Sequence, residues 1–218
     1  MITPRTSCLW ILLLAVAGCA STPPTRPQCP TDPFPLLCAI KQNDSPLINQ
    51  ILDQGTPVNQ MQSGVSPLAF AAGSAKPETV QLLLDRGADI HAVGEAGATA
   101  LDLAAAEGRL ENAKLLLSAG ADFRHKAEFD TTALHRAAGR GASKVARLLI
   151  EIGANVNARQ TGGETALMIA ASRGSLRTVK VLLEAGADRR IRNEAGKTAY
   201  DYAVAQRFPK VAELLKLD

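Results

Sequence analysis

The sequence predicts an all-α solenoid of six stacked helix-turn-helix units, and three observations support this prediction. A segment that starts with Ser or Thr and has Leu or Tyr two residues later returns every 33 residues, at Ser66, Thr99, Thr132, Thr165 and Thr198. A glycine follows each of the first four segments after 21 residues, at Gly87, Gly120, Gly153 and Gly186. Counting backwards, the same frame is matched after one deletion by Pro35, Leu36, Ala39 and Gly55. A constant period of this size is typical of an array in which each unit buries one face against the next.

The unit from Thr99 to Gly120 shows why each repeat is expected to form two short helices. Thr99 and Asp102 have the spacing of a capping box, in which each side chain accepts a hydrogen bond from the other residue's backbone N–H. Gly108 marks a turn, and Gly120 is placed to end the second helix in the left-handed conformation. Apolar residues recur at helical spacing in both helices, at Leu101, Ala104, Ala105, Ala113, Leu116 and Leu117. We therefore expect Leu116 to be fully buried.

The two ends of the array are expected to act as caps, because a solenoid must cover its outermost faces. Gln50 stands at the position that Leu82 fills in the following unit. Lys216 stands at the position that apolar residues fill in the preceding units, namely Leu84, Leu117, Ile150 and Leu183. Polar residues at these two places predict that the first and last units face solvent.

Over residues 34–218 this pattern resembles the ankyrin repeat. The motif Thr-Pro-Leu-His-x-Ala of that family is matched loosely, because alanine replaces proline at 100, 133, 166 and 199 and the histidine occurs only at His135. The resemblance implies a hairpin before each of the later units, with its tip projecting to one side. The turn glycine of these hairpins is present at Gly64, Gly97, Gly163 and Gly196, and Asp130 replaces it in the middle unit.

The resemblance also implies a binding groove, formed by the hairpin tips and the exposed side of the first helix of each unit. By register the tips carry Met61 and Gln62, Val93 and Glu95, Lys126, Glu128 and Phe129, Arg159, Gln160 and Thr161, and Arg192, Asn193 and Glu194. Glu107, Arg140 and Arg173 are the helix positions expected to face the groove. The residues predicted to bind a partner protein are Lys126, Phe129, Arg159, Arg192, Arg140 and Arg173.

Two features of this surface support the prediction that it binds a partner protein, and each also has an alternative explanation. Phe129 is an aromatic residue on a polar tip, which is typical of an interface anchor, although it would also fit local packing against the turn at Asp130. The basic run towards the C-terminus favours a partner with an acidic surface, although such a run also fits a solvated face. Its members are Arg159, Arg173, Arg189, Arg190, Arg192 and Lys197.

The start of the chain predicts export and lipid attachment. Arg5 precedes an apolar run from Leu9 to Ala17, which is too short to span a bilayer. Because Val16-Ala17-Gly18-Cys19 looks like a bacterial lipobox, residues 1–18 are expected to be a lipoprotein signal peptide and Cys19 the lipidated residue. The alternative is a plain signal peptide that is cleaved after Ala15-Val16-Ala17. Residues 19–33 are rich in proline and are expected to be a spacer, followed by the repeat domain at 34–218.

The cysteines and the net charge of the chain bear on the compartment in which the protein is expected and on the ligands it is expected to bind. Cys29 and Cys38 are expected to form a disulfide in an oxidising periplasm, and the alternative is two free thiols with Cys38 packed in its helix. Ala20, the residue after Cys19, suggests delivery to the outer membrane by resemblance to bacterial sorting rules. Arg5 is the only charged residue of 1–18, so the remainder has 23 Lys and Arg against 21 Asp and Glu. A net charge of +2 does not support nucleic-acid binding.

The sequence shows no set of residues that predicts catalysis, and we expect neither a cofactor nor a small-molecule substrate. His135 is expected to make a structural hydrogen bond. His91 and His125 lie on successive hairpins one residue out of register, and a metal shared between them is the alternative from a different functional class. The expected role is binding another protein at a bacterial membrane, facing the periplasm. By resemblance to exported ankyrin proteins, this would be immunity against a secreted toxin or support of a periplasmic enzyme.

Overall fold

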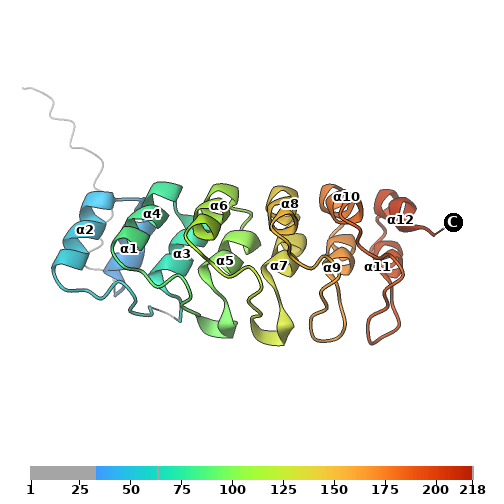
Figure 1. Ribbon diagram of the computed structural model, residues 1–218, viewed down its shortest axis with the longest axis horizontal. Helices are drawn as coiled ribbons and strands as arrows, with labels where there is room; N and C mark the ends of the chain where they lie inside the picture. Colours follow the sequence, from blue (N-terminus) through green and yellow to red (C-terminus); the bar gives the residue numbers. More distant parts are fainter. Residues whose placement is uncertain (1–32, 63, 218) are drawn as a thin grey trace, which may run out of the picture.

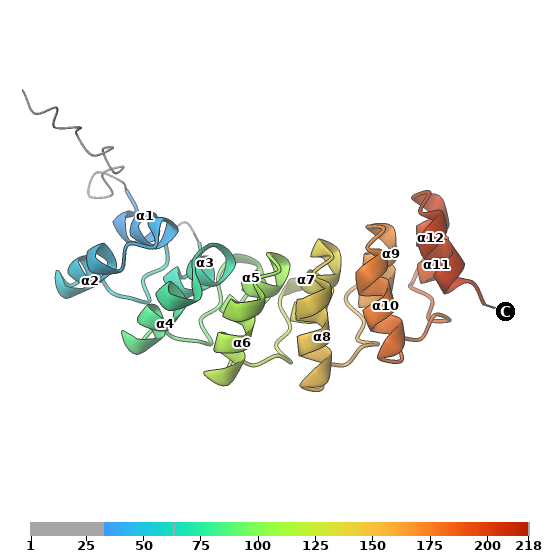
Figure 2. The ribbon, with the colours of Figure 1, turned by 90° about the horizontal axis from the view of Figure 1, so that it is seen from above.

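The computed structural model describes residues 33–62 and 64–217, which form one row of helix pairs stacked along the long axis of the molecule (Figure 1). Each inner helix contacts the inner helix of the next unit, and each outer helix from α4 to α12 contacts its outer neighbours. Figure 2 shows the row from above, with the two helices of each unit alongside one another. The predicted all-α repeat solenoid is confirmed, and the described residues contain six helix pairs.

The inner helices are α1 (Pro35–Gln42), α3 (Pro67–Ser74), α5 (Ala100–Ala106), α7 (Ala133–Arg140), α9 (Ala166–Ser172) and α11 (Ala199–Ala205). The outer helices are α2 (Ser45–Asp53), α4 (Pro77–Asp85), α6 (Leu110–Ser118), α8 (Ser143–Glu151), α10 (Leu176–Glu184) and α12 (Pro209–Leu215). Two hairpin tips form short 3-10 turns, η2 (Glu95–Gly97) and η3 (Glu128–Asp130). Between the described elements, the only β pairing is at two isolated bridges, Gln62 with Val65 and Arg159 with Thr165.

The repeated Ser or Thr begins each inner helix from α3 onwards, as the period predicts. At α5 the backbone N–H of Thr99 donates to Asp102 Oδ2 (2.9 Å), and the N–H of Asp102 donates to Thr99 Oγ1 (3.3 Å). The glycines act as expected as well, with φ of +67° at Gly108 and +96° at Gly120. These conformations are open to glycine because it has no Cβ.

The core is a continuous layer of small and large apolar side chains between the helix pairs. Ala104 and Ala105 on α5 and Leu116 on α6 have no exposed surface, which confirms the predicted buried face. Asn112 was not singled out from the sequence, yet it is buried and its Nδ2 donates to the carbonyls of Ala72 (2.9 Å) and Ala75 (3.0 Å). Burial of this amide is tolerated because both donors are satisfied by the preceding unit.

The end units expose polar residues at the predicted positions, and the last unit also exposes an apolar one. Gln50 and Lys216 are exposed, as expected of caps. At the C-terminal end, however, Val204 is 50% exposed at the position where Ala171 is fully buried in the preceding unit. Polar capping is therefore partial in the last unit.

Candidate functional site

The hairpins place their side chains alternately outward and inward, because successive residues of an extended segment point to opposite sides. The outward position is exposed in every unit that has a hairpin, and we call it the hairpin row: Met61, Val93, Lys126, Arg159 and Arg192. The next residue along faces inward and is mostly buried, as at Gln62 (7% exposed) and Asn193 (9%). Two of the predicted tip residues are thus not part of the surface. Asn193 instead donates through Nδ2 to the Tyr202 hydroxyl at 3.0 Å.

The hairpin row changes from apolar to basic along the stack. Lys126 Nζ lies 3.2 Å from Asp130 Oδ1 in an exposed ion pair. Arg159 Nη2 donates to the carbonyl of Arg192 (3.0 Å), and Arg192 Nη1 donates to that of Gly196 (2.7 Å). Within the described residues neither arginine is paired with a carboxylate, so both charges remain available to an acidic partner.

The tip of the middle hairpin has an unusual backbone. Phe129 and Asp130 both adopt the left-handed conformation, with φ of +61° and +57°. Gly162 and Gly163 occupy the same register in the next hairpin, with φ of +88° and +76°. A left-handed conformation costs an L-residue about 1–2 kcal/mol relative to glycine, and it is rare for bulky side chains. The middle hairpin therefore forms its turn with Asp130 in place of the glycine of the other hairpins.

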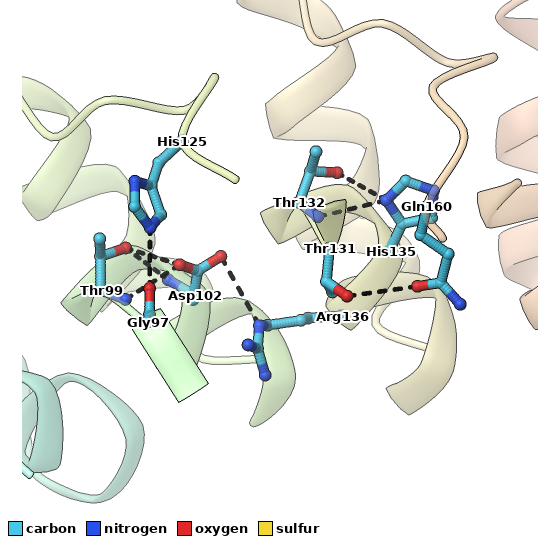
Figure 3. Close-up of polar contacts among 9 residues, drawn as sticks. All are labelled: Gly97, Thr99, Asp102, His125, Thr131, Thr132, His135, Arg136 and Gln160. Carbon is cyan, nitrogen blue, oxygen red and sulfur yellow. Dashed lines mark hydrogen bonds and ion pairs between the residues drawn. The ribbon is translucent and has the colours of Figure 1, made fainter. Parts of the chain in front are cut away.

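The side chain of Phe129 projects into solvent, with 71% of its surface exposed. It does not pack against the turn, so the alternative reading of this residue was wrong. Its carbonyl oxygen accepts a hydrogen bond from the N–H of Thr161 (2.8 Å), which fixes the tip to the next hairpin. Thr131 Oγ1 also donates to Gln160 Oε1 at 3.3 Å (Figure 3). The aromatic ring is therefore presented from a backbone that is held in place.

The inner helices contribute a second row that the sequence reasoning missed. Its members are half-buried and lie four residues after each capping Ser or Thr: Phe70, Leu103, Arg136, Ile169 and Tyr202. This constant spacing is the signal that would have revealed them. Arg136 is the only charged member, and its Nε lies 3.7 Å from the buried carboxylate of Asp102 (Figure 3).

Arg140 and Arg173 lie at the opposite end of the inner helices from the hairpins. Arg140 is the last residue of α7, and Arg173 follows the end of α9. Because seven to eight helical residues separate them from the hairpin side, they are about 10–12 Å along the helix axis from it. Arg140 Nη2 also pairs with Glu107 Oε2 at 3.0 Å. The structure thus brings Lys126, Phe129, Arg159 and Arg192 together on the hairpins and sets Arg140 and Arg173 apart from them.

The three histidines have different surroundings. His135 is buried, and its Nδ1 accepts a hydrogen bond from the backbone N–H of Thr132 (3.3 Å; Figure 3). Its Nε2 faces the carbonyl of Ala158 at 3.0 Å. This geometry requires the neutral ring with its proton on Nε2, and burial lowers the pKa of His135 from the usual 6.5. The predicted structural role of His135 is confirmed. His125 Nε2 lies 2.8 Å from the carbonyl of Gly97, and His91 is exposed.

The hairpin after the middle one is held by a polar network. Glu164 accepts from Gln160 Nε2 (3.0 Å) and from the hydroxyl of Tyr202 on α11. The hydrogen bond to Glu164 raises the pKa of Tyr202 to about 12. Across the described part of the chain, no group of three or more His, Cys, Asp or Glu side chains is arranged to hold a metal ion.

A row of helix pairs that each contact only their neighbours, with hairpins along one edge, defines a helical repeat protein. The family model for ankyrin repeats (3 copies) matches residues 36–127, 97–160 and 134–218, so the chain belongs to the ankyrin repeat family. No curated protein matches the chain. Ankyrin repeats are generally modules of protein–protein interaction, and the fold is typically a scaffold without enzymatic activity.

Proposed function

We propose that this chain is a lipid-anchored protein of the bacterial periplasm that binds another protein through its hairpins, with Phe129 as the anchor. The observation that supports this proposal most strongly is the combination of exposure and backbone conformation at Phe129. The fold accepts Ala96 or Gly162 at the same register. Phe129 adopts a conformation that would cost glycine nothing, and it leaves its apolar surface in water, so its benefit lies in contact with a partner.

The surroundings of Phe129 indicate the chemistry of the partner. Arg159 and Arg192 stand on the two hairpins that follow the hairpin of Phe129, and neither has a carboxylate partner among the described residues. A complementary surface would offer an apolar pocket for the ring and acidic residues beside it. Charge complementarity would increase the association rate, while burial of the aromatic ring would supply most of the affinity.

The membrane anchor rests on the sequence pattern around Cys19. Residues 1–32, including Cys19 and Cys29, lie outside the described residues, so lipidation, the spacer and the Cys29–Cys38 disulfide remain predictions. Among the helices that the structure describes, none combines the length and apolar character needed to cross a bilayer. Incorporation of labelled palmitate into the wild-type chain and its loss in Cys19→Ser would support the anchor. Equal labelling of both chains would contradict it.

Capture of a partner from membranes tests the hairpin surface. Full-length protein would be compared with Phe129→Ala and Arg192→Ala, and with the controls Tyr200→Ala and Lys41→Ala, which change exposed residues of the same chemical types elsewhere. We expect one protein to be captured by the wild type and both controls, to be lost with Phe129→Ala and to be reduced with Arg192→Ala. Unchanged capture by both hairpin variants would refute the assignment.

A further inference from the structure

The outer helices carry a hollow, away from the hairpins. It has a volume of about 500 Å³ and lies between α6, α8 and α10. Leu110, Leu148 and Val181 give it an apolar floor. Its charged lining consists of Lys114, Lys144, Arg147, Arg177, Lys180, Glu151 and Glu184. The hollow therefore combines an apolar floor with a predominantly cationic wall, and we call it the outer groove.

Three of the cations in the outer groove are not neutralised. Arg147 pairs with Glu184 (2.9 Å) across the groove, and Lys114 pairs with Glu111 (2.9 Å) beside it. Lys144, Arg177 and Lys180 are exposed and make neither an ion pair nor a side-chain hydrogen bond with any described residue. Positive charge is thus concentrated at the end of the groove where α8 and α10 begin.

The repeat register shows that this charge is not a requirement of the fold. The second residue of the outer helix is acidic in α4 and α6, at Glu78 and Glu111, and basic in α8, α10 and α12, at Lys144, Arg177 and Lys210. Acidic residues are favoured in the first helical turn, because the N-terminus of a helix carries partial positive charge. The basic residues therefore occupy a position where electrostatics within the helix opposes them.

The adjoining turns extend the positive charge. Residues 140–144, 173–177 and 207–210 contain six Lys and Arg but no Asp or Glu. In the corresponding turn of the third unit, Arg109 lies between Glu107 and Glu111. The change from mixed to purely basic turns takes place at the fourth unit, where the outer groove also has its centre.

We propose that the outer groove binds an acidic polypeptide segment of a protein partner, whose carboxylates contact Lys144, Arg177 and Lys180 and whose apolar side chains lie on the apolar floor. A bilayer of anionic lipids fits less well, because a flat surface does not enter a hollow and would be repelled by Glu151, which has no ion-pair partner among the described residues. A segment with its acidic residues at one end avoids this repulsion. Since the groove lies on the outer helices, the hairpins and the groove can be occupied at the same time.

A defined probe tests this proposal. The full chain with Cys19→Ser would be titrated into a fluorescein-labelled helical peptide of Glu, Leu and Ala, and binding would be followed by fluorescence anisotropy. We expect binding that weakens with added salt. Lys144→Glu combined with Arg177→Glu should weaken it at least about tenfold. These changes restore the residue type of Glu78 and Glu111, so the urea midpoint should not fall.

Lys41→Glu combined with Lys76→Glu is the matched control, because it changes the net charge equally at exposed residues of the first two units, which belong neither to the outer groove nor to the hairpin row. Binding equal to wild type in this control, together with loss in the groove variant, would support the outer groove. Equal weakening by both variants, or no binding of the peptide to the wild type, would overturn it. Groove-dependent binding of phosphatidylglycerol vesicles without binding of the peptide would also overturn it and would favour a membrane surface.

Discussion

The middle hairpin and the hairpin that follows it meet the same backbone requirement with different residues. Both turn through two consecutive left-handed residues, which are Phe129 and Asp130 in one and Gly162 and Gly163 in the other. The glycine pair adopts this conformation without strain, whereas Phe129 adopts it with strain. In addition, the ring of Phe129 is exposed to solvent. The difference teaches that residues that depart from a repeat at structural cost are better guides to function than residues that keep it.

The two hairpins also differ in how they are supported. The second is tied to α11 through Glu164 and Tyr202 and to α7 through the His135 contact at Ala158. The middle one is held at its tip by the hydrogen bond from Thr161 to the carbonyl of Phe129. The well-supported hairpin thus serves as a base on which its neighbour presents an aromatic side chain.

The largest expected effect is a loss of folding stability when a core residue is truncated. Leu116 is fully buried, so Leu116→Ala should lower the free energy of unfolding by about 2–5 kcal/mol through lost burial and the cavity left behind. Phe129→Ala should change it by less than about 0.5 kcal/mol, because the ring is exposed and the backbone strain remains. Urea denaturation measures both. Similar losses for the two variants would place Phe129 in the fold and not at an interface.

The next effect is on partner binding. Once a partner has been purified, Phe129→Ala should weaken its Kd by about 30-fold or more, as expected of an interface hot spot worth about 2 kcal/mol. Thr161→Ala in the neighbouring hairpin should change it by less than about threefold, since the hydrogen bond of Thr161 to the middle tip uses the backbone. Isothermal titration calorimetry provides both values. Equal changes in Kd would remove the distinction between the two hairpins.

A smaller effect is expected on stability at the tip itself. Phe129→Gly should be more stable than Phe129→Ala by about 1 kcal/mol, because glycine adopts the left-handed conformation without strain but gains freedom in the unfolded chain. Both variants lack the ring, so both should bind the partner equally poorly. Equal urea midpoints for the two variants would show that the backbone at Phe129 is not strained.

The smallest expected effect is a dependence of folding stability on pH, which arises from His135 beside the second hairpin. Burial lowers the pKa of His135, so below about pH 6.5 the unfolded chain takes up a proton more readily than the folded chain. Stability contributed by the neutral ring should therefore be present above that pH and decline as pH falls towards 5.5. In His135→Asp, which has the capping residue type of Asp102, this decline should be absent. His91→Gln should behave as the wild type in urea titrations across this range.

The fold was predictable because the residues that set it recur at every period. Thr99 with Asp102, the alanines of α5 and Leu116 all behave as their spacing indicates. The inward orientation of Gln62 and Asn193 was not predictable by the same means, because the hairpin positions vary too much to show alternation. The unusual backbone at Phe129 could be suspected only from the absence of glycine at position 130.

The outer groove could not be predicted from the sequence for a different reason. Lys144 and Arg177 look like solvated residues of amphipathic helices when they are considered singly. Their meaning depends on three neighbouring helices that share one hollow, which a single repeat does not contain. Comparing the same helix position from Glu78 to Lys210 was possible from the sequence, but the apolar floor beneath the cations required the structure.

Exchange of the hairpin tips tests the central claim most directly. The double variant Phe129→Gly with Asp130→Gly gives the middle hairpin the residues of Gly162 and Gly163, and it loses only the exposed Lys126 ion pair in addition. We predict a urea midpoint at or above that of the wild type together with loss of the membrane-captured partner. Undiminished capture, or a marked fall in the urea midpoint, would contradict the role of Phe129 as an anchor that the fold does not need.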